Sequence, residues 1–238
     1  MENKEMIYEG KAKIVYQADN ENEVIIYFKD DATAFNGVKK ASIQNKGILN
    51  NKITTIIFNY LESNGVDTHY IKTLNDREQL TDKIKIIPLE FICRNIVAGS
   101  MAKRLGMEEG QILEEPILEI CYKKDELNDP LLNDYHAYAL GLVTKEQLHE
   151  CYDKVLKVNE LLQKLFLEIG IILVDFKVEF GFNKEGKIVL ADEFSPDNAR
   201  LWDEVTKKKL DKDVFRRDLG NIVDTYQYIL EKLEDLNL

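Results

Sequence analysis

The sequence predicts an α+β fold: a mostly antiparallel, strand-rich first lobe followed by a second lobe in which helices surround a β-hairpin. Three observations support this prediction. Short runs of β-branched and aromatic residues fill the first third, an apolar stripe with helical spacing begins after Thr144, and residues 174–180 alternate between apolar and charged. The 238 residues suffice for one large domain or two lobes, because such a chain buries about 70–75% of its unfolded surface.

The first lobe is predicted to consist mainly of strands. IYEGKAKIVYQ and EVIIYFKD are typical of strands, with turns at Gly10 and near Asp19-Asn20. A helix is predicted over residues 46–62, because apolar residues recur there with the helical period before Asn64-Gly65 ends it. THYIKTLN and KIKIIPLEFICRNIVAG predict further strands, and Pro88 in the second indicates a sheet edge or a crossing point between the lobes.

The second lobe is predicted to be richer in helices. A short helix is expected over residues 100–105, then a strand that leads into the polar segment 123–134, which is either a lid or ligand loop or, slightly favoured, a plain surface loop. Thr144 with Gln147 forms a capping box for the clearest helix, which ends at Gly170. A last helix is expected over about residues 213–236.

The alternating strand carries a candidate site. Asp175, Lys177 and Glu179 fall on one face of it, and Asn183-Lys184-Glu185-Gly186 forms a turn into the return strand KIVLADEF. If the loop is those four residues, Asp192 lies on the same face. Three carboxylates and a lysine on one surface suit a divalent metal with a phosphorylated ligand. An ordinary solvated strand face gives the same alternation, and an odd loop would turn Asp192 away.

Composition excludes several functional classes. The chain has 32 Lys and Arg against 43 Asp and Glu, a formal charge of −11, which disfavours nucleic acid and anionic membranes as partners. The three cysteines are far apart without a CxxC motif, which disfavours disulfides and zinc, and the three histidines form no cluster and no HExxH motif. The charged start MENKEMIYEG is unlike a signal peptide, and no apolar run approaches the roughly 20 residues that span a bilayer, so a cytoplasmic protein is expected.

Two segments carry residues typical of phosphate binding. In EGKAKIVY, Gly10 permits a tight bend, and Lys11 and Lys13 lie two apart, which predicts that they share one strand face beside the bend, although lysines at a hairpin end are more often simply solvated. In PLEFICRNIVAGS, Ser100 precedes a predicted helix and Arg94 lies in the strand before it. That arrangement fits a phosphate seat, and it equally fits ordinary capping with a surface ion pair.

A third segment follows the return strand. In EFSPDNAR, Ser195-Pro196-Asp197 predicts a turn, and Arg200 is a second candidate clamp for phosphate or carboxylate; the alternative is a turn with an exposed arginine. The chain has no GxxxxGK[ST] and no GxGxxG motif, so neither a P-loop nor a Rossmann site is supported.

Together these segments resemble one family. IPLEFICRNIVAGS (87–100) and LVDFKVEFG (173–181) are similar to the two signature segments of the SAICAR synthetase (phosphoribosylaminoimidazole-succinocarboxamide synthase) family of purine biosynthesis. Four further segments look like that family: YEGKAKIVY, TAFNG (33–37), KGILNNK (46–52) and DEFSPDNARLWD (192–203). The resemblance covers nearly the whole chain. Asn36 stands where some members have Asp, so we assign it no role.

The resemblance implies a two-lobed fold distantly similar to protein kinases, with a mostly antiparallel N-terminal sheet lobe, a larger α/β C-terminal lobe and ATP in the cleft between them. Residues 1–238 would form a single unit, in which lobe 1–86 covers the nucleotide and lobe 87–238 binds substrate and metal. The implied reaction joins L-aspartate to the carboxylate of carboxyaminoimidazole ribonucleotide (CAIR), giving SAICAR, ADP and phosphate through an acyl phosphate. A homo-oligomer fits the family, whereas the sequence itself gives no oligomeric state.

The family's functional roles carry over by position. They fall on Gly10, Lys11, Ala12, Lys13 and the stretch around Ile86 for ATP; on Glu179 and Asp192 for magnesium; on Arg94, Ser100, Asp197 and Arg200 for CAIR; and on Lys177 and Asp175 at the reacting carboxylate. Because CAIR, ATP and aspartate are all anionic, cations in the site must offset their repulsion within an acidic protein.

Two alternative functions fit part of the sequence. An inositol-phosphate-type kinase shares an Asp-x-Lys strand and a related fold, but it needs a denser basic pocket than this chain offers. A nucleotide-binding module without catalysis would be expected to lack some of Lys177, Glu179 and Asp192, and all three are present.

Overall fold

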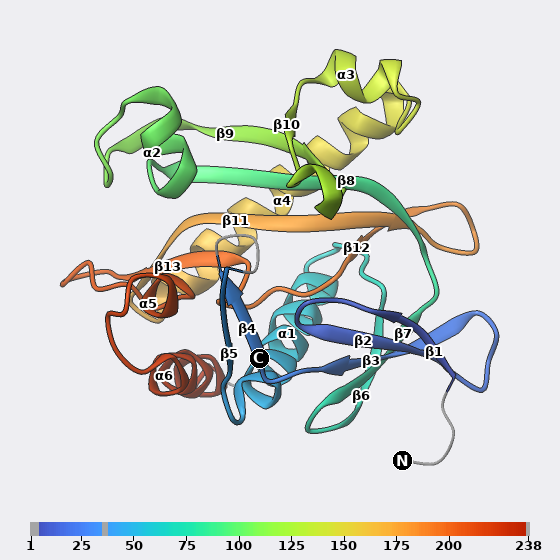
Figure 1. The fold of residues 1–238 in the computed structure, drawn as a ribbon, viewed down its shortest axis with the longest axis horizontal. Helices are drawn as coiled ribbons and strands as arrows, with labels where there is room; N and C mark the ends of the chain where they lie inside the picture. Colours follow the sequence, from blue (N-terminus) through green and yellow to red (C-terminus); the bar gives the residue numbers. More distant parts are fainter. Residues whose placement is uncertain (1–4, 35–37, 237–238) are drawn as a thin grey trace.

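Two antiparallel sheets form the frame of the protein, and the chain passes from one to the other between β7 and β8 (Figure 1). The computed structural model describes residues 5–34 and 38–236. The first sheet has the order β1 (Met6–Glu9), β2 (Lys13–Gln17), β3 (Glu23–Phe28), β7 (Glu78–Asp82) and β6 (Tyr70–Asn75). Beside it, β4 (Asp31–Ala34) pairs with β5 (Lys39–Ser42). The predicted antiparallel character of the first third is confirmed, while Phe35, Asn36 and Gly37 of the TAFNG segment lie outside the described residues.

The second sheet is larger than the predicted hairpin. It has the order β10 (Leu131–Leu132), β9 (Ile112–Tyr122), β8 (Lys85–Ile96), β11 (Ile171–Phe182) and β12 (Ile188–Ala191), with β13 (Ala199–Asp203) also paired to β11. All these pairings are antiparallel, and β12 and β13 share one edge of β11 end to end. The long strands β8 and β11 therefore lie side by side at the centre of the sheet.

Helix α4 (Lys145–Glu168) covers one face of this sheet and forms the main core with it (Figure 1). Most buried apolar residues of α4 and β11 belong to one cluster, which includes Val155, Leu162, Phe166, Phe176, Val178 and Phe180. The predicted capping box is confirmed, because Thr144 Oγ1 accepts from the Gln147 N–H and Gln147 Oε1 accepts from the Thr144 N–H. Val174 is an exception to the predicted apolar face: it packs against Ile96, beside a bulge in the β11–β13 pairing.

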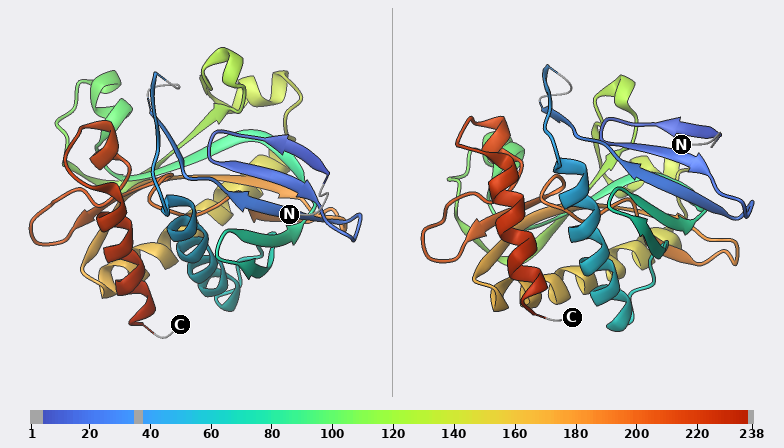
Figure 2. Two further views of the ribbon diagram at one scale, coloured as in Figure 1. Left: turned by 60° about the horizontal axis from the view of Figure 1, so that its bottom comes forward. Right: turned by 90° about the horizontal axis from the view of Figure 1, so that it is seen from below.

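Helix α1 (Lys46–Ser63) confirms the predicted helix and lies alongside α6 (Ile222–Glu234), as Figure 2 shows. Its first turn comes very close to the end of β3. A Cβ at Gly47 would lie 2.4 Å from the carbonyl oxygen of Phe28, so only glycine fits there. This contact packs α1 tightly against the first sheet.

The remaining helices are short: α2 (Gly99–Leu105), the 3-10 helix η1 (Asp125–Leu127), α3 (Asp134–Ala139) and α5 (Asp213–Arg216). The prediction of one continuous last helix is therefore wrong, because the chain forms α5 and then α6. Asp218, with a φ of 53°, and Gly220, with a φ of 151°, lie between the two helices and prevent a continuous helix, and the Asn221 side chain accepts from the Val223 N–H to start α6. The break matters for the site, because α5 and the residues before it border a cavity described below.

Pro88 does not lie at a sheet edge. Strand β8 is paired on both sides, with β9 and with β11. Proline is tolerated because the N–H that it lacks would point to the same side as its carbonyl, which accepts from the Lys123 N–H just beyond the end of β9, where that ladder stops. The alternative prediction, a crossing point, fits better, because β8 follows directly after the last strand of the first sheet.

The structure shows the cysteines unpaired and His69 in a structural position. Cys93, Cys121 and Cys151 are free. His69 is buried edge-on against Phe58, and burial lowers its pKa to about 4, so it is neutral at physiological pH. Among the described residues, no helix is both long enough and apolar enough to cross a bilayer.

Candidate active site

Strand β11 pairs with β8, and the charged face of β11 carries the residues of the predicted site. Three cross-strand pairs line it: Asp175 with Arg94, Lys177 with Ile92, and Glu179 with Glu90. Asp175 and Glu179 are each only 3% exposed, so this is not an ordinary solvated strand face. Lys177 Nζ donates a hydrogen bond to Glu90 Oε1, the cross-strand partner of Glu179, which holds the ammonium group near Glu179 and Asp192.

The predicted hairpin register is wrong, yet Asp192 still reaches the predicted face. Phe182 pairs with Ile188, so the loop is one residue longer than predicted, and alternation alone would turn Asp192 away. Asp192 follows the last residue of β12, however, and its φ of 67° lies in the left-handed region. That conformation ends the alternation, and the Asp192 carboxylate accepts from Lys13 Nζ in the cavity that Glu179 also lines.

Three lysines surround this pair of carboxylates: Lys13, Lys123 and Lys177. Burial raises the pKa of Asp192, but the three lysines outweigh it and lower the pKa to about 2. The pKa of Glu179 is raised, because burial and the charge of Asp192 outweigh the lysines nearest to it. The site thus keeps Asp192 ionised. A further cation would stabilise the ionised form of Glu179 beside it.

A cavity of about 550 Å³ lies between the two sheets, above these carboxylates. All the residues predicted to bind ATP line it: Gly10, Lys11, Ala12, Lys13 and Ile86. Val15, Val24 and Ile26 add an apolar wall from the first sheet. Lys11 and Lys13 do not share a strand face as predicted, because Lys11 lies in the bend before β2 and pairs with Asp125 at the rim.

A second cavity of about 350 Å³ adjoins the first. All the residues predicted to bind CAIR line it, together with both residues predicted at the reacting carboxylate: Arg94, Ser100, Asp197, Arg200, Asp175 and Lys177. Lys11 and Lys177 line both cavities. The two cavities therefore meet at Lys177.

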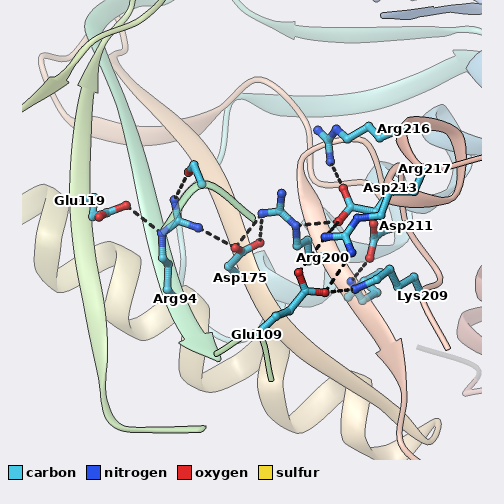
Figure 3. A network of polar contacts seen from close by, with 12 residues as sticks. Arg94, Glu109, Glu119, Asp175, Arg200, Lys209, Asp211, Asp213, Arg216 and Arg217 are labelled. Carbon is cyan, nitrogen blue, oxygen red and sulfur yellow. Dashed lines mark hydrogen bonds and ion pairs between the residues drawn. The ribbon is translucent and has the colours of Figure 1, made fainter. Parts of the chain in front are cut away.

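Asp175 bridges the two arginines of the second cavity (Figure 3). Its carboxylate accepts from Arg94 Nη1 at 2.8 Å and from Arg200 Nη1 at 2.9 Å. Arg94 Nη2 lies 3.4 Å from Ser100 Oγ, and Arg200 Nη2 lies against Gly99, where a Cβ would be 2.4 Å away. Both guanidinium groups therefore present Nη2 toward the start of α2.

If the second cavity binds CAIR, as the family resemblance implies, Gly99→Ala is expected to raise the KM for CAIR about 10-fold or more, because the new methyl group displaces the Arg200 guanidinium from its place on the backbone. Gly99 has a φ of 56°, so alanine there also carries a backbone cost of about 1 kcal/mol. Steady-state kinetics with varied CAIR measure the effect.

The matched control is Gly106→Ala at the other end of α2. Gly106 has a φ of 64°, and a Cβ there meets nothing within 4 Å. It should lower the melting temperature to a similar extent and leave the KM for CAIR unchanged. Equal effects of both variants on that KM would contradict the proposed contact.

Asp197 is held by a buried network. Its carboxylate accepts from Lys46 Nζ at 2.5 Å and from the Tyr226 hydroxyl at 2.7 Å. Burial opposes ionisation, but Lys212 and Lys46 outweigh it and lower the pKa of Asp197. Asp197 is therefore a fixed negative charge in the wall of the second cavity.

Sequence reasoning missed several residues of the site. Lys123 reaches Glu179 from the end of β9, so the favoured plain loop at 123–134 instead borders the first cavity. Glu90, the partner of Lys177, and Lys46, the partner of Asp197, were also missed. For the last two a sequence signal existed, because both lie within segments that resemble the family; Lys123 lies in none of them.

Comparison with known proteins decides the family. The family model for SAICAR synthetase matches residues 6–233. The chain belongs to the SAICAR synthetase family. The phosphoribosylaminoimidazole-succinocarboxamide synthase of Fusobacterium nucleatum is 57% identical over 235 residues, which is 99% of each chain. Neither the inositol-phosphate-type kinase nor the non-catalytic module is supported.

Two solved structures of SAICAR synthetases have the same fold. The enzyme from Ehrlichia chaffeensis superposes with a TM-score of 0.95 at 46% identity, covering 97% of this chain and 98% of that one. A SAICAR synthetase (Type-2) solved in complex with ADP gives a TM-score of 0.93 at 48% identity, covering 96% and 97%. The family is that of the ATP-dependent ligases of purine biosynthesis, and this chain matches it over nearly its whole length.

Proposed function

We propose that this chain joins L-aspartate to the carboxylate of CAIR at the expense of ATP, through an acyl phosphate. The observation that carries the proposal is the meeting of the two cavities at Lys177. A phosphoryl donor in one cavity and a carboxylate acceptor in the other would react where the two join. In this proposal residues 1–86 cover the nucleotide and residues 87–238 bind the substrate and the metal.

ATP would occupy the first cavity. The ADP complex of a 48% identical relative supports a nucleotide-binding site in this fold. The apolar wall suits a purine base near Ile86, and Lys11 and Lys13 at the bend after Gly10 suit the phosphates. Lys13 is held ionised, because its carboxylate neighbours outweigh burial and raise its pKa.

Magnesium fits the donor set of Glu179 and Asp192. Among the residues that the structure describes, no three His, Cys, Asp or Glu side chains form a self-contained metal site. Two carboxylates are nevertheless what Mg²⁺ takes from a protein when nucleotide phosphates and water complete its shell. When bound, the ion would neutralise phosphate charge during transfer.

CAIR would occupy the second cavity, with its 5′-phosphate on Arg94, Arg200 and Ser100. Both arginines donate hydrogen bonds to the Asp175 carboxylate. We therefore assign Asp175 the role of orienting the arginines beside the reacting carboxylate, and not a role in proton transfer. Asp197 would accept hydrogen bonds from the ribose or the imidazole amine. Lys177 would hold the reacting carboxylate next to the γ-phosphate.

The reaction would proceed in two steps. A carboxylate oxygen of CAIR attacks the γ-phosphorus, the bond to the bridging oxygen breaks, and ADP leaves. The amine of L-aspartate then attacks the acyl carbon and loses a proton, and phosphate departs with the former carboxylate oxygen. The protein's part is to position the reactants and stabilise negative charge, for which an ionised Lys177 is suited because its carboxylate neighbours raise its pKa.

The test uses purified protein with CAIR that carries 18O in its carboxylate. ADP release should require CAIR, L-aspartate and Mg²⁺ together, and the released phosphate should contain one 18O atom. ADP release without that label would exclude activation of the carboxylate by phosphorylation. No ADP release with CAIR and aspartate would refute the proposed function itself.

A cytoplasmic location completes the proposal. It accords with the three free cysteines and with the small, phosphorylated substrates, which are made and used inside cells. The partners in this proposal are the three small molecules CAIR, L-aspartate and ATP, with neither nucleic acid nor membrane.

A further inference from the structure

The proposed phosphate seat consists of Arg94, Arg200 and Ser100. Each of its two arginines has a second carboxylate partner, on the side away from Asp175 (Figure 3). Arg94 Nε donates to Glu119 Oε2 at 2.8 Å, and Arg200 Nε donates to Asp213 Oδ2 at 3.1 Å. With Asp175 between them, the five side chains form a chain of alternating charge across four strands (β9, β8, β11 and β13) and α5. In both arginines, two nitrogens are held by carboxylates, and the third, Nη2, faces the start of α2.

Asp213 is anchored independently of Arg200. Its side chain is 2% exposed, and its backbone N–H donates to Asp211 Oδ1 at 2.7 Å. Asp211 also accepts from the Leu201 N–H, so the same carboxylate joins the residue after Arg200 to the start of α5. Arg216 Nη1 donates to the other oxygen of Asp213 at 2.7 Å. The Asp213 side chain is therefore held in place by its neighbours, and it in turn fixes the position of Arg200.

Glu119 is the corresponding fixed point for Arg94. It lies on β9, its side chain is 10% exposed, and its second oxygen accepts from Arg104 of α2. Since Ser100 belongs to the same short helix, Glu119 ties the strand that carries Arg94 to the segment that carries Ser100. Glu119 and Asp213 thus hold the two arginines from opposite sides of the phosphate seat.

We infer that Glu119 and Asp213 are positioning residues for the 5′-phosphate of CAIR: each fixes one arginine so that its Nη2 points into the seat. This inference rests on the proposed function and deepens it. An arginine held at Nε and Nη1 loses little further side-chain entropy when Nη2 binds phosphate, so the site is preorganised. Neither carboxylate needs to touch the substrate.

Simple electrostatics and orientation of the arginines predict opposite changes in phosphate affinity when Glu119 or Asp213 loses its charge. The inference can therefore be tested by the direction of the change. Each carboxylate is an anion near a bound dianion, so removing its charge should strengthen phosphate binding if orientation were unimportant. If orientation dominates, removing the charge should weaken binding although the site becomes more positive. The sign of the change therefore decides between the two effects.

The experiment compares Asp213→Asn and Glu119→Gln with the unaltered enzyme. Two quantities are measured: the KM for CAIR, and the inhibition constant of ribose 5-phosphate competing with CAIR. Both should rise by the same factor, about 10-fold for each variant, because each variant loses a charge-assisted hydrogen bond that aims Nη2. The KM for ATP should change less than about twofold, since the nucleotide lies in the other cavity.

Matched controls are Glu115→Gln on the same strand as Glu119 and Asp224→Asn shortly after Asp213, both at exposed positions. Neither should change the KM for CAIR or inhibition by ribose 5-phosphate. Should Asp213→Asn fail to fold, Glu119→Gln still tests the inference from the other side of the seat.

Three results would overturn the inference: tighter ribose 5-phosphate binding in the variants, unchanged binding, or an equal loss for ATP and CAIR. The last would indicate only a general structural role. None of them would touch the proposed function, which fails instead if the unaltered enzyme releases no ADP with CAIR and aspartate.

Discussion

Lys177→Ala is expected to lower kcat by about 10²- to 10³-fold, the usual cost of removing one preorganised donor from a developing negative charge. The KM for CAIR should change far less, because the proposed 5′-phosphate seat on Arg94 and Arg200 stays intact. Nζ of Lys177 is held by Glu90 where the two cavities meet, so it can act on the transferring phosphoryl group and on its acceptor. Steady-state kinetics with CAIR and ATP varied separately measure both parameters.

Lys184→Ala is the matched control, because Lys184 is an exposed lysine in the turn of the same hairpin. It should leave kcat within about twofold, as expected for a surface substitution. A Lys177 variant that lost only affinity for CAIR, with normal kcat, would place the ammonium group in substrate binding and refute its proposed role in the transfer.

Asp192→Asn is expected to lower kcat/KM by at least about 10²-fold and to raise the Mg²⁺ concentration needed for half-maximal activity. One of the two proposed metal ligands loses its charge, and metal coordination is typically worth several kcal/mol in phosphoryl transfer. Asparagine is a suitable replacement because it tolerates the left-handed conformation of residue 192, whose φ is 67°. ADP release measured against free Mg²⁺ gives both numbers.

Asp67→Asn provides the control, since Asp67 is exposed and outside both cavities. It should leave the Mg²⁺ dependence unchanged. An Asp192→Asn enzyme with normal activity at low Mg²⁺ would mean that the ion is bound elsewhere and that Asp192 serves only to neutralise Lys13.

Much of the site could be predicted locally. The period-two alternation of Asp175, Lys177 and Glu179 placed three groups on one face, and the apolar groups between them pack mainly against α4. Backbone geometry alone requires this once the segment is a strand. The predicted face of Asp192 is correct, but for the wrong reason. Two departures from the ideal hairpin, a longer loop and a left-handed residue, offset each other.

The sequence by itself determined most of the long strands and helices, which face of β11 is charged, and which family the chain resembles, because period, capping and motif order are properties of contiguous residues. Only the tertiary structure decided which nitrogen of each arginine faces the proposed seat, that Lys123 reaches Glu179, and that Lys46 is buried against Asp197. Those contacts join residues 6 to 151 positions apart. They depend on strand register, loop length and single left-handed residues, which local patterns leave open.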